Sequence, residues 1–371
     1  MSRKWNFYAG PSTLPLEVLT ELRDTMVDYH NEGLSLIETS HRSPEYDAVH
    51  YQAMDLVREL LEVPANYKIL FLGGGATLQF AMVPLNLLTG DKICDYALTG
   101  SWAKSAYKDA AKLGQARAAF DGSPSGFTTL PVNGGGSGPA LEASPSSSYL
   151  HITSNETIGG LQYKTWPVPA QGSQVPLVAD MSSDIMSRKI PVEKFGLIYG
   201  GAQKNLGPAG VTLVIIREDL LERSPESLPA YLSYRVHGEK DSLYNTPPVF
   251  ALYGVKLVLE WLKKNGGLAA AQERNEEKAG LIYGRIDRYP EIYRCPVEKA
   301  ARSLMNIVFT LDTPEREKEF LGGAGERGML GLKGHRSVGG CRASVYNGMP
   351  LAGARALADY MDDFAAKGGK T

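Results

Sequence analysis

Short apolar runs alternate with polar, glycine-rich segments through the first two thirds of the chain. The runs are Lys68–Leu72, Lys92–Leu98, Tyr149–Thr153, Pro176–Ala179, Leu197–Tyr199 and Val211–Ile216. Most of them lead into residues rich in Gly, Ser or Asp, and several then lead into helical periodicity. Short buried strands that alternate with helices are typical of an α/β fold with a largely parallel or mixed sheet. Ligands of such sheets bind beyond the carboxyl ends of the strands, so the segments after these runs are candidate site regions.

The length of 371 residues is too great for one ordinary core and predicts two domains. We predict a large domain over residues 16–255 and a smaller C-terminal domain over 256–371, joined by the N-terminal segment 1–15. A long helical pattern from about Phe250 links the two. The smaller domain is expected to contain a strand in SLMNIVFTL and an amphipathic helix near Ala352–Ala366, and the glycine-rich stretch Gly322–Gly325 is interpreted as a turn.

The composition excludes several classes of protein. Thirty-nine basic and 41 acidic side chains leave a net charge of −2, which provides no footprint for a nucleic acid or a membrane surface. No apolar run approaches the roughly 18 residues that span a bilayer, and the N-terminus lacks the apolar core of a signal peptide. The three cysteines are widely spaced and form neither a zinc motif nor a disulfide framework. We therefore predict a cytoplasmic enzyme without a bound metal.

The segment Gly73–Thr77 joins a predicted strand to a predicted helix. Small residues let backbone N–H groups approach an anion, and the start of a helix adds partial positive charge. The segment is neither a P-loop nor a GxGxxG motif. On its own the segment favours an ordinary tight turn between strand and helix, with a phosphate site as the alternative.

Two charged residues follow predicted strands. Asp180 comes directly after PLVA, where it is either a helix N-cap or a negative charge aimed at a ligand. Lys204 follows LIY in the segment YGGAQKNLGPAG, and a lone lysine is usually a surface residue. A phosphate cup, an acid and a lysine at one sheet edge are the set that pyridoxal 5′-phosphate (PLP) requires. Trp102, after KICDYAL, is a candidate to stack on its ring.

Eight segments in order resemble the signature blocks of the phosphoserine aminotransferase family. They are NFYAGPSTLP, SHRSPEY, GGGATLQFAMVPLNLL, SNETIGG, VADMSSDI, GGAQKNLGPAG, YNTPPVFALY and GHRSVGGCRASVYN, spanning Asn6 to Asn347. The family is a class V member of the fold-type I, aspartate-aminotransferase-like PLP enzymes. The resemblance implies a mostly parallel seven-stranded sheet in the large domain, a smaller α/β C-terminal domain, and a homodimer with active sites at the subunit interface.

The resemblance also assigns cofactor roles to individual residues. Lys204 matches the Schiff-base lysine, Asp180 the partner of the pyridine nitrogen, and Trp102 the stacking aromatic. Thr157 matches the threonine near the 3′-oxygen of the cofactor. The phosphate cup would comprise Ala76, Thr77 and Gln203, completed by Asn245 and Thr246 from the neighbouring subunit. Some family members carry Arg or Cys at the positions of Ala76 and Thr77, so here we expect backbone and hydroxyl donors in place of a side-chain charge.

Five further residues are candidates for substrate binding: His41, Arg42, His335, Arg336 and Arg342. Arginine suits the bidentate grip of carboxylate and phosphate, although surface arginines with incidental histidines would look the same. By resemblance, Arg342 binds the α-carboxylate. The two His-Arg pairs would hold the phosphate of one substrate or the γ-carboxylate of glutamate, and one pair would come from the partner subunit.

The implied reaction is transamination between L-glutamate and 3-phosphohydroxypyruvate, giving O-phospho-L-serine and 2-oxoglutarate, with a related role in pyridoxine biosynthesis left open. Two other classes stay open: a different class V enzyme, such as another transaminase or a cysteine desulfurase, and a non-enzymatic phosphate-binding module. A desulfurase needs a reactive cysteine on a mobile loop. Cys94 lies in a predicted buried strand, Cys295 lies near the second domain, and Cys341 is interpreted as a packing residue.

Overall fold

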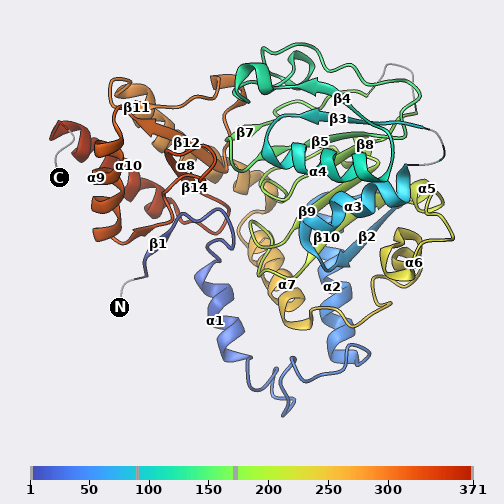
Figure 1. The fold of residues 1–371 in the computed structure, drawn as a ribbon. Helices are drawn as coiled ribbons and strands as arrows, with labels where there is room; N and C mark the ends of the chain where they lie inside the picture. Colours follow the sequence, from blue (N-terminus) through green and yellow to red (C-terminus); the bar gives the residue numbers. More distant parts are fainter. Residues whose placement is uncertain (1–2, 89, 91, 170–173, 369–371) are drawn as a thin grey trace.

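The central sheet has seven strands in the order β2-β10-β9-β8-β5-β3-β4 (Figure 1). This computed structural model describes residues 3–88, 90, 92–169 and 174–368. The strands are β2 (Tyr67–Leu72), β3 (Cys94–Leu98), β4 (Ala116–Asp121), β5 (Leu150–Thr153), β8 (Leu177–Asp180), β9 (Leu197–Gly201) and β10 (Thr212–Arg217). Strand β10 runs antiparallel to β2 and β9, and the other neighbouring pairs are parallel. The predicted mostly parallel seven-stranded sheet is confirmed.

Side chains of the central sheet are buried on both faces. In β10, Leu213 and Ile215 pack into one core, whereas Val214 and Ile216 pack into another. The first core includes side chains of α2 (Pro44–Leu60) and α7 (Val249–Lys264). The second includes side chains of α3 (Gly75–Leu87), α4 (Ser101–Leu113), α5 (Glu218–Leu221) and α6 (Tyr234–Glu239). Burial on both faces explains why the strands read as continuous apolar runs.

A second, three-stranded antiparallel sheet lies toward the C-terminus, in orange and red in Figure 1. It consists of β11 (Tyr293–Arg294), β12 (Asn306–Leu311) and β14 (Cys341–Ser344). It shares a core with α8 (Gly267–Arg288), α9 (Pro314–Glu326) and α10 (Leu351–Ala366). The strand predicted in SLMNIVFTL and the helix predicted near Ala352–Ala366 are confirmed as β12 and α10.

The interpretation of Gly322–Gly325 as a turn is wrong, because these residues lie inside α9. The helix begins with a cap in which the Thr313 side chain accepts a hydrogen bond from the Arg316 N–H. Further along, Phe320 and Ala324 are buried in the core of the second sheet. This packing outweighs the low helix propensity of the three glycines in the stretch.

The N-terminal segment joins distant parts of the chain. Strand β1 (Trp5–Asn6) pairs in parallel with β13 (Met329–Leu330), and α1 (Leu16–Asp24) packs against α7. A separate small sheet contains β6 (Asn155–Glu156) and β7 (Leu161–Gln162). The predicted domain boundary after residue 255 falls inside α7, and the division into domains stays a prediction. Across the described ranges, no helix combines the length and apolarity that crossing a membrane requires.

Candidate active site

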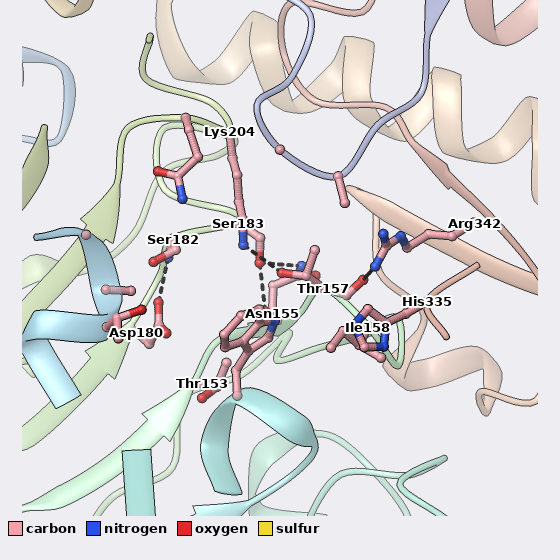
Figure 2. A pocket seen from close by; sticks show the side chains of 17 residues that line it. Thr153, Asn155, Thr157, Ile158, Asp180, Ser182, Ser183, Lys204, His335 and Arg342 are labelled. Carbon is pink, nitrogen blue, oxygen red and sulfur yellow. Dashed lines mark hydrogen bonds between the residues drawn. The ribbon is translucent and has the colours of Figure 1, made fainter. Parts of the chain in front are cut away.

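A cleft of about 320 Å³ opens where β5, β8 and β9 end. Thr153 and Asp180 are the last residues of β5 and β8, and Lys204 follows β9 by three positions. The predicted site residues that line it are Ala76, Thr77, Trp102, Thr157, Asp180, Gln203, Lys204, His335 and Arg342. Figure 2 shows Asp180 on one side of the cleft and His335 and Arg342 on the other, with Thr157 between them.

Lys204 carries the one primary amine among the described residues that line the cleft. Its Nζ donates a hydrogen bond to the Thr157 hydroxyl at 2.8 Å and lies 5.9 Å from the centroid of the Trp102 ring. Burial lowers the pKa of Lys204 to about 8, although the charges of Asp180 and Glu156 offset part of this effect. Near neutral pH a far larger share of this amine is therefore neutral and nucleophilic than in a lysine with the ordinary pKa of 10.5.

The backbone of Lys204 is held by the N-terminal segment. The N–H of Ser12 donates to the Gln203 carbonyl at 3.0 Å, and the Ser12 hydroxyl donates to the Lys204 carbonyl. Beside it, Ala9 and Gly10 line the cleft. Lys204 thus lies between the end of β9 and the N-terminal segment Ala9–Ser12, which we call the strap.

Asp180 provides the buried negative charge of the cleft. The residue is only 5% exposed, and its Oδ1 accepts a hydrogen bond from the Ser182 N–H at 2.9 Å. Burial raises the pKa of Asp180, while the hydrogen bonds from Ser182 and the positive charge of Lys204 act in the opposite direction. A carboxylate held in this way can stabilise a positive charge on a bound ligand.

The first turn of α3 lines the same cleft with Gly75, Ala76 and Thr77. The helix has no side-chain cap, so the N–H groups of its first turn lack partners within the helix. Gly74 precedes it with φ of 83°, and a Cβ at that position would lie 2.5 Å from the Leu78 side chain. Glycine therefore lets the chain turn sharply into a helix whose exposed N–H groups suit a phosphate.

Three side-chain polar atoms in the cleft wall are buried without a partner among the described residues. They are the indole Nε1 of Trp102, the hydroxyl of Thr153 and the Nε of Arg342. Buried polar atoms are nearly always hydrogen-bonded in native structures, so such atoms at a cleft indicate a polar ligand or water. The cleft therefore combines a flat aromatic wall, an amine, a buried acid and an anion-binding helix start, and these residues fit PLP.

His335 and Arg342 form the other side of the cleft (Figure 2). Arg342 lies on β14, and its Nη1 donates to the Thr157 carbonyl at 3.2 Å. Its Nε is buried and has no partner among the described atoms. Donors therefore remain available for a carboxylate beside the Lys204 amine.

Five predicted site residues lie outside the cleft of this chain: His41, Arg42, Arg336, Asn245 and Thr246. Arg42, Arg336, Asn245 and Thr246 are exposed, and His41 is half-buried. Asn245 and Thr246 were expected to act on the site of a neighbouring subunit, and their exposure is compatible with that role. The functions of all five stay predictions.

Gly75 lies in the candidate segment Gly73–Thr77, but sequence reasoning did not assign several other residues that line the cleft: Ala9, Gly10, Thr153, Asn155, Ile158, Ser182 and Ser183. Thr153, Asn155, Ser182 and Ser183 directly end or follow predicted strands, so the strand-end rule contained the signal that could have found them. The N-terminal Ala9 and Gly10 carry no chemical signal of their own, because their position depends on long-range packing.

Comparison with known proteins gives a consistent result. The aminotransferase class-V family model matches residues 4–357. A phosphoserine aminotransferase of Halalkalibacterium halodurans is 51% identical over 364 residues, covering 98% of this chain and 99% of the relative. The chain belongs to the phosphoserine aminotransferase family of class V aminotransferases. The sequence-based prediction of the family is confirmed.

Solved phosphoserine aminotransferases share the whole fold. The enzyme from Bacillus circulans subsp. alkalophilus has a TM-score of 0.94 at 46% identity, with 98% of this chain and 99% of that chain covered. A PLP-bound phosphoserine aminotransferase from Trichomonas vaginalis has a TM-score of 0.90 at 36% identity, covering 97% and 100%. The predicted fold type I is therefore confirmed.

The cysteines of this phosphoserine aminotransferase family member do not line the cleft that contains Lys204. Cys94 and Cys341 are buried in strands, and Cys295 is half-buried. Burial raises the pKa of Cys94 to about 11, and it also raises the pKa of Cys341. Neither buried thiol is poised to act as the nucleophile that a desulfurase requires.

The buried Lys204 predicts a specific pH dependence of stability. The shift of its pKa from 10.5 to about 8 corresponds to roughly 3 kcal/mol of unfolding free energy. Since the folded pKa is below the unfolded one, this cost is complete below pH 8 and disappears as the pH rises to 10.5. Lys204→Met should therefore be more stable than the parent apo-protein at pH 7, with the advantage shrinking between pH 8 and 10.5.

Chemical denaturation of the two apo-proteins across this pH range measures the effect. Lys264→Met, at an exposed position in the last turn of α7, serves as the control and should show a nearly constant difference from the parent. A constant difference for Lys204→Met as well would contradict the buried, perturbed amine.

Proposed function

We propose that this protein is a phosphoserine aminotransferase that uses PLP to transfer the amino group of L-glutamate to 3-phosphohydroxypyruvate. The products would be 2-oxoglutarate and O-phospho-L-serine. The main support is the placement of Lys204, Asp180 and the start of α3 around one cleft. The chain is also 51% identical in sequence to two proteins named phosphoserine aminotransferase. A non-enzymatic phosphate module would leave the amine and the buried acid without a role.

The residues that would hold PLP come from the end of β8, the segment after β9 and the first turns of α3 and α4. Gly75, Ala76, Thr77 and Gln203 would bind its phosphate through backbone and side-chain donors, and Asp180 would pair with its ring nitrogen. Bound PLP would supply an aldehyde that takes up the amino group and a ring that withdraws electrons from the substrate Cα. Trp102 would stack on the ring, with its unpartnered Nε1 free to donate.

Lys204 would perform the proton transfers. Its Nζ would hold the cofactor at rest. Once displaced by the substrate amine, it would take the proton from the substrate Cα and deliver it to the cofactor carbon that had carried the aldehyde. The amine suits this task because burial brings its pKa to about 8, close to the pH of the cell interior. The Thr157 hydroxyl, 2.8 Å from Nζ, would keep the amine directed into the cleft.

Arg342 would bind the α-carboxylate that glutamate and the phosphorylated keto acid share. Its guanidinium is directed by the Thr157 carbonyl, which places it next to the hydroxyl that orients the lysine. His335 lines the same side of the cleft and would contact the distal phosphate or γ-carboxylate, together with Arg336 and the pair His41 and Arg42. Bidentate arginine contacts would then fix the Cα close to Lys204.

We also propose that the enzyme is a homodimer in which Asn245 and Thr246 complete the phosphate site of the partner. The exposed loop that carries them follows Asp241, whose carbonyl lies 2.8 Å from His50 Nε2 of α2. Apolar side chains are also exposed on α1, on α2, between these two helices and in the loop before Asn245. They are Leu16, Met26, Val27, Leu34, Ile37, Tyr51 and Tyr244. A second copy would cover such a surface. A mass by light scattering equal to one chain would contradict the dimer.

A substrate comparison tests the proposed activity. Glutamate-dependent conversion is measured with 3-phosphohydroxypyruvate, pyruvate, glyoxylate and 3-hydroxy-2-oxo-4-phosphooxybutanoate. The proposal expects clear preference for the phosphorylated acids, and use of the last one would support the additional role in pyridoxine biosynthesis. Preference for pyruvate or glyoxylate would assign the protein to another class V transaminase.

Cell fractionation tests the predicted cytoplasmic location of the protein.

The same assay separates the roles of the arginines. Arg336→Leu should raise the KM for 3-phosphohydroxypyruvate by about tenfold or more while PLP binding stays unchanged, because a lost charged hydrogen bond costs about 1.5–3 kcal/mol. Arg294→Leu, at an exposed position on β11, is the matched control. Equal losses of substrate and cofactor binding in Arg336→Leu would indicate a structural role.

A further inference from the structure

Glu156 is a fully buried carboxylate that accepts hydrogen bonds from a helix more than fifty residues away in the sequence. It lies on β6, and its Oε1 and Oε2 accept hydrogen bonds from the Ala103 N–H at 3.0 Å and the Trp102 N–H at 3.2 Å. Both donors belong to the first turn of α4, which has no acidic residue in that turn and no cap from the side chain of its own N-cap residue. Glu156 therefore caps α4 from outside the helix.

The approach of the helix to this carboxylate depends on Gly100. A Cβ at that position would lie 2.5 Å from the Glu156 carboxyl carbon and 2.7 Å from its Oε2. No side chain fits into that space unless the carboxylate moves. The glycine before α4 and the acid on β6 thus form one close contact.

Glu156 connects two walls of the cleft. On one side, its sequence neighbour Thr157 accepts the hydrogen bond from Lys204 Nζ at 2.8 Å. On the other side, the cap holds the backbone of Trp102, whose ring centroid lies 5.9 Å from the same Nζ. A change in the position of this carboxylate would alter the separation between the aromatic wall and the amine.

The environment of the carboxylate is unusual for a simple helix cap. Burial raises the pKa of Glu156 to about 7, while the N–H groups of Ala103 and Trp102 and the charge of Lys204 favour the ionised form. Most helix caps are short polar side chains next to the helix itself. A buried acid that costs stability beside a reactive amine is more typical of a functional site.

We propose that Glu156 is a positioning residue that sets the distance and orientation of Trp102 relative to Lys204, and thereby the fit of the PLP ring between them. The proposal rests on the proposed function, since the placement of Trp102 matters to catalysis when a planar cofactor occupies the cleft. Glu156 does not line the cleft and acts through its neighbours.

The test compares Glu156→Ala with Thr313→Ala. Both variants remove a helix cap, but Thr313 caps α9, which packs in the core of the second sheet. The dissociation constant of PLP and the thermal midpoint are measured for each apo-protein. We expect Glu156→Ala to raise the PLP dissociation constant about tenfold, in line with a cap worth about 1.4 kcal/mol. Thr313→Ala should lower the midpoint and leave PLP binding within about twofold of the parent.

A second readout follows Trp102 without the cofactor. The near-ultraviolet circular dichroism of Trp102 is obtained by subtracting the spectrum of a Trp102→Phe version of each apo-protein. Glu156→Ala should change this difference spectrum, whereas Thr313→Ala should not. Glu156→Gln, which keeps the size and one acceptor of the side chain, should change both readouts in the same direction but less, and it replaces Glu156→Ala if that variant does not fold.

Unchanged PLP binding together with an unchanged Trp102 spectrum in Glu156→Gln and Glu156→Ala would overturn the proposal. Weaker PLP binding in both Glu156→Ala and Thr313→Ala, in proportion to lost stability, would also overturn it. If the parent protein binds no PLP, the proposed function fails by itself. The Trp102 spectrum of the apo-protein then still shows whether Glu156 positions the ring.

Discussion

Replacing Lys204 with Ala is expected to lower glutamate-dependent transamination by about 10⁴-fold or more. The variant loses the amine that we assign to both cofactor attachment and proton transfer at the substrate Cα. No other lysine among the described residues lines the cleft, so no neighbouring side chain can take over. Turnover is measured with glutamate and 3-phosphohydroxypyruvate, and attachment of the cofactor is followed by its visible absorbance.

Lys204→Arg is the matched control for the loss of charge. It keeps a cation near Asp180, but a guanidinium is not deprotonated at physiological pH and cannot act as the base. We expect this variant to be inactive too. Lys204→Ala should fold because it removes a buried amine that destabilises the chain, and Lys204→Arg should fold because its cation keeps the favourable interaction with Asp180. Turnover close to the parent value in either variant would exclude the assigned role of Lys204.

Replacing Asp180 with Asn is expected to lower turnover by about a thousandfold and to weaken PLP binding. The amide keeps the shape of the side chain and can still accept from the Ser182 N–H, but it provides no negative charge for the ring nitrogen. Removing one partner of a buried charge pair costs about 3–5 kcal/mol. Since Asp180 also raises the pKa of Lys204, the pH at which the amine titrates should fall in the variant.

Asp184→Asn provides the matched control, because Asp184 is as deeply buried as Asp180 and lies four residues further along. It accepts hydrogen bonds from Ser154 and Gln162 and does not line the cleft. The control should lower thermal stability while reducing turnover by less than about tenfold. Equal losses of turnover in the two variants would mean that Asp180 acts through the fold and not through the cofactor.

Local patterns in the sequence account for most of the central sheet and for the chemical core of the site. Six of its strands follow from buried apolar runs, and Asp180 and Lys204 follow from their positions after two of them. The edge strand β4 was not recognised, because most of its residues are exposed or half-exposed and it lacks an apolar run. A strand of that kind is defined by its partner β3 and not by its own composition.

The remaining features depend on contacts that no local pattern records. The cap of α4 by Glu156 joins residues more than fifty positions apart, and its sequence signal is one acid in SNETIGG. The position of Arg342 beside Thr157 depends on how β14 packs near the central sheet. The solvent exposure of the Asn245 and Arg336 side chains could not be predicted either. Both residues lie in loops, and the path of a loop is determined by tertiary packing.

The strap that holds Lys204 has a consequence for the order in which the enzyme matures during synthesis. Ser12 bonds the backbone around Lys204, while β1, a few residues earlier, pairs with β13 in the last eighth of the chain. Contacts of such long sequence separation form late, because the chain entropy lost in closing them must first be overcome. The central sheet can assemble as soon as its strands have left the ribosome. The pairing of β1 with β13, which holds the strap in place, can form only after β13 has been synthesised. A nascent chain would therefore contain the lysine and the acid well before it could place them for catalysis.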